Sequence, residues 1–139
     1  MNVLYDFIIE FVAAFLGFLF AILFAGISSK IENKKKQKML LKNIHNELKD
    51  IHDSIKEYED NNALLRHRIA VPTWDALQYS GGVMDLIGES YYDELLTAYS
   101  SIKMFNDERR EMSDKEIKKI MEEILESSHN VLTQIEKDL

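Results

Sequence analysis

The sequence predicts an all-α protein in which one N-terminal transmembrane helix continues into a cytosolic bundle of about four helices. Three observations carry this prediction. Residues 11–27 form a run of 17 residues without a charge. One proline and five glycines in 139 residues are too few to separate many strands with turns. Beyond residue 40, apolar residues recur at spacings of three and four, which is the period of a helix packed on one side.

The apolar run is long enough for a membrane helix. About 20 apolar residues cross a hydrocarbon core about 30 Å thick, and a helix satisfies its own backbone there. Residues 7–27 meet this requirement with Glu10 as their only interruption. A buried core helix would need more surrounding chain than is present, and a cleaved signal peptide would need a basic start, whereas Asp6 and Glu10 are acidic. We therefore expect a retained single-pass anchor over residues 1–28.

Lysines follow the apolar run, and none precedes it. Basic residues close to a membrane helix stay on the cytoplasmic side. We therefore expect a cell-membrane protein with its N-terminus outside and residues 28–139 in the cytoplasm. Each lysine near an anionic membrane surface contributes about 1 kcal/mol of binding. The lysines that we expect to contact headgroups are Lys30, Lys34, Lys35, Lys36 and Lys38.

The net charge of −7 is unevenly distributed. Residues 29–49 contain seven lysines and two glutamates, whereas residues 50–139 contain ten basic and twenty acidic residues. An acidic surface repels phosphates, so we expect no nucleic-acid partner. The acidic residues form either a solvated face that keeps the domain soluble or a docking surface.

Small residues recur four apart along the apolar run, on one helical stripe that Glu10 shares. This spacing favours close packing of membrane helices, although alanine and glycine are also common in such helices generally. Glu10 either reaches the outer interface, or lines an oligomer lumen, or faces a partner's basic group. We expect self-association, or docking on another membrane protein, through Glu10, Ala13, Gly17, Ala21 and Ala25.

The second segment, residues 29–70, is predicted to be a basic juxtamembrane long helix, because no proline or glycine lies between Ile27 and Ala70. Asn62 and Leu65 extend its heptad register. A heptad stripe supports two interpretations equally: a coiled coil between protomers, or the first helix of an intramolecular bundle. The stripe consists of Leu41, Ile44, Leu48, Ile51, Ile55 and Tyr58.

Residues 71–139 are predicted to form a helical bundle domain that packs on the long helix. Pro72 disfavours helix at the preceding residue, and Thr73 is the expected cap of a helix that starts at Trp74. Gly81 and Gly82 indicate the turn that ends it.

Two further helices complete the predicted bundle, and a short connection makes them antiparallel. Ser90 is the expected N-cap of the first, and Ser113 with Glu116 forms a capping box for the second. The expected core contains Trp74, Leu77, Tyr92, Leu95, Tyr99, Ile102, Ile117, Ile124 and Val131.

Several segments resemble known proteins: the single span, LLKNIHNEL, WDALQYSG, and the spacing of Tyr92, Leu95, Tyr99 and Ile102. Together they are similar to small uncharacterised single-pass, membrane-anchored helical proteins of archaea and bacteria, and that resemblance implies no activity. In layout the chain also resembles small membrane effectors of prokaryotic antiviral systems, which couple an oligomeric membrane helix to a cytosolic sensor.

No catalytic pattern is present in the sequence. The chain has no cysteine, its four histidines are scattered, and no Ser, His and acidic residue stand in a motif. We expect no enzyme, cofactor or metal site. The leading hypothesis is an anchored helical interaction or regulatory module that self-associates or docks on a membrane partner. The alternative is a small oligomeric pore or membrane effector gated by its cytosolic helical domain.

Overall fold

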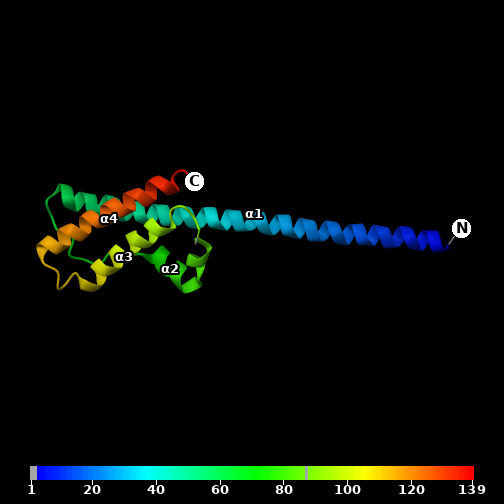
Figure 1. The fold of residues 1–139 in the computed structure, drawn as a ribbon, viewed down its shortest axis with the longest axis horizontal. Coiled ribbons are helices and arrows are strands. Elements are labelled where there is room, and N and C mark those ends of the chain that lie inside the picture. Colours follow the sequence, from blue (N-terminus) through cyan, green and yellow to red (C-terminus); the bar gives the residue numbers. More distant parts are fainter. Residues whose placement is uncertain (1–2, 87) are drawn as a thin grey trace. The chain divides into compact units, whose positions relative to one another are not determined.

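The computed structural model describes residues 3–86 and 88–139, and the side chains of residues 3–9, including Asp6, and of residue 85 lie outside this description. The described residues contain four α-helices and no strand, so the all-α class is confirmed (Figure 1). The helices are α1 (Val3–Asp60), α2 (Pro72–Ser80), α3 (Tyr92–Glu108) and α4 (Asp114–Ile135), with a 3-10 helix η1 (Gly82–Leu86) after α2. The chain divides into an N-terminal unit, Met1–Met39, and a C-terminal unit, Leu40–Leu139.

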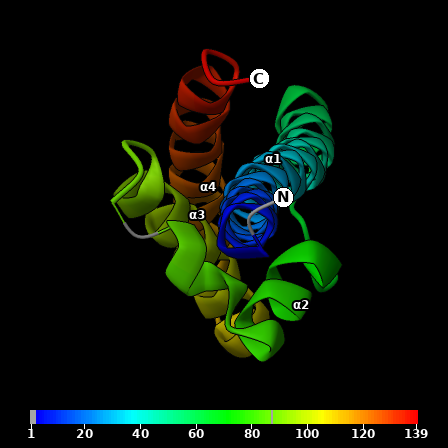
Figure 2. The same ribbon diagram turned by 90° about the vertical axis from the view of Figure 1, so that its right-hand side faces the viewer.

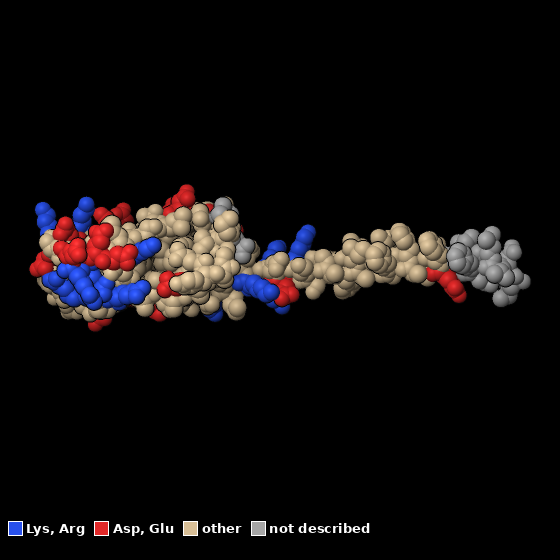
Figure 3. Space-filling view, turned by 90° about the horizontal axis from the view of Figure 1, so that it is seen from below, with Lys and Arg blue, Asp and Glu red and all other residues tan. Residues whose placement is uncertain are grey.

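The described part of the N-terminal unit, from Val3 onward, is the first part of α1. Every side chain from Glu10 to Met39 is exposed, including the large apolar ones of the uncharged run. In Figure 3, the surface of this run accordingly shows no Lys, Arg, Asp or Glu side chain. By its length and composition, α1 is a helix that could cross a membrane.

The C-terminal unit builds one hydrophobic core from the end of α1 and from α2, α3 and α4 (Figure 2). α3 packs along α4, as its short connection through residues 109–113 requires. Of the predicted core residues, all but Tyr92 are buried. The largest completely enclosed side chains include Ile44, Leu48, Leu95, Ile102, Phe105, Ile117 and Ile124.

α1 ends at Asp60, so the prediction of a helix toward residue 70 is wrong. Asn62 adopts a left-handed conformation with φ 51°, which asparagine tolerates better than most residues. The N–H of Ala63 then donates to the carbonyl of Tyr58 at 2.8 Å, closing the helix in the manner of a Schellman motif. Leu65 is buried, but it lies in the loop and does not continue the heptad register.

α2 begins two residues earlier than predicted, with Pro72 in its first turn and Val71 at the N-cap. The predicted cap by Thr73 is wrong, because Thr73 lies inside the helix. The predicted glycine turn is confirmed, since Gly81 ends α2 with φ 74°. Gly82 lies so close to Leu77 that an added Cβ would approach its Cδ2 to 2.7 Å.

Of the predictions for the two remaining helix starts, the one for α3 is wrong and the one for α4 is correct. α3 has Tyr91 at its N-cap, and Ser90 makes no cap there. Tyr91 is buried whereas Tyr92 is only half-buried, so the core prediction is wrong by one residue. The capping box of α4 is confirmed: the N–H of Ser113 donates to Glu116 Oε2 at 2.7 Å, and the Glu116 N–H donates to Ser113 Oγ at 3.4 Å.

Candidate functional site

The small residues predicted for membrane association remain open on the surface of α1. Glu10, Ala13, Gly17, Ala21 and Ala25 are all exposed, and their four-residue spacing places the small residues on one stripe. In the described part of the chain, a Cβ added at Gly17 would have no heavy atom within 4 Å other than those of its chain neighbours and its own helix backbone. The stripe is therefore available to another helix.

The predicted headgroup lysines, Lys30, Lys34, Lys35, Lys36 and Lys38, are also exposed on α1. Lys36 pairs with Glu32 one helical turn earlier at 2.9 Å, and this hydrogen bond and the lysine charge lower the pKa of the Glu32 carboxyl. Because both side chains are well exposed, this ion pair is weak, and a phosphate could replace Glu32 as the partner of Lys36.

The heptad stripe of α1 is used inside its own chain. Five of its members are buried in the core of the C-terminal unit, and Tyr58 packs against that core half-buried. A coiled coil between protomers would need the same side chains. This part of α1 is therefore the first helix of the intramolecular bundle, and its apolar stripe is not free for a partner. The buried members of the stripe are Leu41, Ile44, Leu48, Ile51 and Ile55.

Glu47 joins three helices of the C-terminal unit. Its Oε2 accepts the N–H of Thr73 at 2.6 Å, and its Oε1 accepts the N–H of Trp74 at 3.2 Å. Oε1 also accepts the hydroxyl of Tyr99 at 2.7 Å. A carboxylate from α1 thus caps the N-terminus of α2, where the unpaired amides and the helix dipole favour negative charge.

Trp74 and Tyr99 form the apolar side of this arrangement. Their rings stack with centroids 4.2 Å apart and an interplanar angle of 6°. Burial raises the pKa of Tyr99 far above its ordinary value, and the charge of Glu47 and its hydrogen bond act in the same direction. Tyr99 therefore donates to Glu47 as a neutral phenol throughout the physiological range.

The loop between α1 and α2 is fastened at two points. The buried side chain of Asn106 on α3 bonds both the N–H and the carbonyl of Ile69, each at 2.8 Å. Arg66 pairs with Asp114 at the start of α4. Nothing in the sequence near Asn106 indicated this role, because its partner lies 37 residues away.

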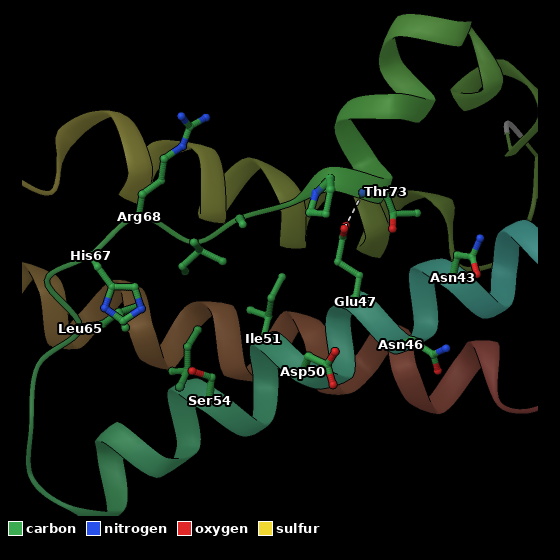
Figure 4. Close-up of a pocket in the computed structure, with 14 residues that line it drawn as sticks. Asn43, Asn46, Glu47, Asp50, Ile51, Ser54, Leu65, His67, Arg68 and Thr73 are labelled. Carbon is green, nitrogen blue, oxygen red and sulfur yellow. Dashed lines mark hydrogen bonds between the residues drawn. The ribbon is translucent and has the colours of Figure 1, made fainter.

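A groove of about 590 Å³ lies between α1 and this fastened loop (Figure 4). Polar side chains of α1 form one wall, the loop forms the other, and buried isoleucine and leucine side chains contribute apolar lining. Its lining combines an apolar surface with a few polar groups, as the lining of a binding site does. Its lining includes Asn43, Asn46, Asp50, Ser54, Arg68 and Ala70.

The histidines of α1 lie along its contact with α4. His45 is within 3.2 Å of Glu136, and the rings of His52 and His129 have centroids 6.1 Å apart. Both side chains are partly buried, at the edge of the apolar stripe of α1.

Comparisons with protein-family models, with curated proteins and with solved structures found no match.

Proposed function

We propose that the chain is a membrane-anchored helical interaction module that self-associates, or docks on another membrane protein, through α1. The observation that carries this proposal is the contrast between the two parts of α1. From Leu41 onward its apolar stripe is buried in the bundle, whereas every apolar side chain from Phe11 to Ile27 is exposed. An uncovered apolar surface of this extent needs lipid or a partner helix.

The proposed orientation places the N-terminus outside the cell and the C-terminal unit in the cytoplasm. Its support is the group of exposed lysines after the apolar run, which favours the cytoplasmic side and anionic headgroups. Reporter fusions at both termini test this topology. A C-terminal reporter that is active outside the cell contradicts it.

Disulfide crosslinking in membranes tests self-association with little background, because the chain contains no cysteine. Ala21→Cys places a thiol on the small-residue stripe, and Leu19→Cys places one on nearly the opposite side of the helix. Oxidation should yield mainly dimers of Ala21→Cys, and Gly17→Leu in the same chain should reduce them because it holds the backbones apart.

The remaining outcomes of this experiment are equally informative. A chain that stays monomeric with either cysteine contradicts self-association and leaves docking on a different membrane protein. A pore, the alternative function, would be supported by dye release from vesicles that Glu10→Gln abolishes, because the exposed carboxylate would then line a lumen.

A further inference from the structure

The groove of the C-terminal unit has two unlike walls, and these define the chemistry of what fits between them. We propose that it binds an extended, basic peptide segment of a partner protein, paired through its backbone with Arg68 and Ala70. Every residue that carries this proposal lies in the C-terminal unit. The proposal is therefore independent of self-association through the apolar part of α1.

The conformation of the loop wall follows from the hydrogen bonds of Ile69. One planar amide, that of Asn106, donates to the Ile69 carbonyl and accepts from the Ile69 N–H. It reaches both groups only because they point to the same side, which is the geometry of a hydrogen-bonded residue in an antiparallel ladder. Asn106 thus takes the place that a residue of a neighbouring strand would take.

In an extended chain the backbone N–H and carbonyl groups of successive residues alternate between two edges, so the proposal assigns those of Arg68 and Ala70 to the edge opposite Asn106. Arg68 and Ala70 are exposed, and both line the groove. Among the hydrogen bonds of residues 3–86 and 88–139, none uses the backbone N–H or carbonyl of either residue. This short edge is open to an added strand.

The opposite wall, on α1, is rich in hydrogen-bond acceptors. Asp50 contributes an exposed carboxylate, and Asn43, Asn46 and Ser54 add amide and hydroxyl oxygens (Figure 4). The ion pairs of the described residues do not include Asp50. In Figure 4 the guanidinium of Arg68 points away from α1, so it does not neutralise this wall.

The apolar lining between the walls also favours particular side chains in the bound peptide. Ile51, Ile55, Leu65 and Ile69 are buried residues that line the groove. A lysine or arginine side chain can lay its aliphatic stem on such a surface while its charged end reaches Asp50. An extended segment that alternates basic and β-branched residues matches the open backbone edge, the negative wall and the apolar lining together.

Fluorescence anisotropy tests this with the full-length chain in phosphatidylcholine nanodiscs, whose lipid has no net charge and does not attract a basic peptide. The probe is a labelled, blocked pentapeptide of sequence Val-Arg-Val-Arg-Val. Comparison peptides carry glutamate in place of arginine, or N-methyl groups on one backbone edge or on the other. The glutamate peptide should not bind. Methylation of one edge should weaken binding about tenfold or more and methylation of the other edge less, because only one edge pairs with the loop.

Asp50→Asn should weaken binding of the arginine peptide about two- to fivefold, as for a partly exposed ion pair. Asp53→Asn is the matched control, since Asp53 is exposed on the same helix and does not line the groove. The proposal is overturned if the arginine peptide does not bind at millimolar concentration or if the glutamate peptide binds equally well. The proposal is also overturned if methylation of either backbone edge weakens binding equally, or if Asp50→Asn and Asp53→Asn change the affinity equally.

Discussion

The carboxylate of Glu47 on α1 accepts a hydrogen bond of 2.7 Å from the hydroxyl of Tyr99 on α3, although the two residues are 52 positions apart. The same carboxylate accepts two backbone amides of α2. α2 is a helix of nine residues, too short to be stable alone. Its position therefore depends on this carboxylate together with the burial of Trp74 and Leu77.

We predict that Glu47→Gln destabilises the C-terminal unit by about 1–3 kcal/mol. Glutamine offers one acceptor oxygen in place of two and no charge, so a donor at the start of α2 or on Tyr99 loses its partner. Chemical denaturation of the full chain in detergent, followed by Trp74 fluorescence, measures the change. Glu57→Gln is the control, because Glu57 is exposed on the same helix. An equal effect of both variants would show that Glu47 has no special role.

Alkaline pH should destabilise the C-terminal unit. Burial, with the charges of Glu89 and Asp138, raises the pKa of Tyr91 to about 12, and Tyr99 is raised further in the same direction. A raised tyrosine pKa means that the folded state favours the neutral phenol. This contribution is complete below the unfolded value near 10 and is lost as the pH rises toward 12.

The measurement is the free energy of unfolding between about pH 8 and pH 12, with absorbance at 295 nm recording phenolate formation. In Tyr91→Phe the loss of stability over this range should be smaller than in the parent. Tyr79→Phe is the control, because Tyr79 is 93% exposed. The same pH dependence in all three proteins would contradict the assignment to Tyr91.

Trp74→Ala should lower the free energy of unfolding by about 3–5 kcal/mol, because it removes a large buried side chain and its stacking on Tyr99. Trp74→Phe should retain much of this contribution. Circular dichroism during thermal unfolding compares the variants. An unchanged melting temperature of Trp74→Ala would mean that Trp74 is not part of the core.

The sequence predicted features whose partners are close along the chain. The heptad spacing indicated which side of α1 is apolar, and the capping box of Ser113 and Glu116 needs only three residues of separation. The glycine turn at Gly81 was likewise readable, because few other residues adopt φ 74° without strain. These are local rules of backbone geometry and helix period.

The missed features depend on contacts between distant segments. The end of α1 at Asp60 relies on a left-handed asparagine, with no proline or glycine beside it to mark the boundary. The capping of α2 by Glu47 spans 26 residues, and Asn106, which holds the loop wall of the groove at Ile69, lies 37 residues from it. The heptad stripe allowed two interpretations because periodicity shows that a face is apolar and does not show what covers it.

Asn106→Ala should release the loop at Ile69 and destabilise the C-terminal unit by about 1–3 kcal/mol for each buried backbone group left without a partner. Hydrogen exchange of residues 66–71, measured by mass spectrometry on the full chain, should become faster because the Ile69 N–H loses its acceptor. Asn130→Ala, at an exposed position of α4, is the control and should leave this exchange unchanged. Slow exchange retained in Asn106→Ala would show that other contacts hold the loop, and the extended conformation inferred for Ile69 would then need a different cause.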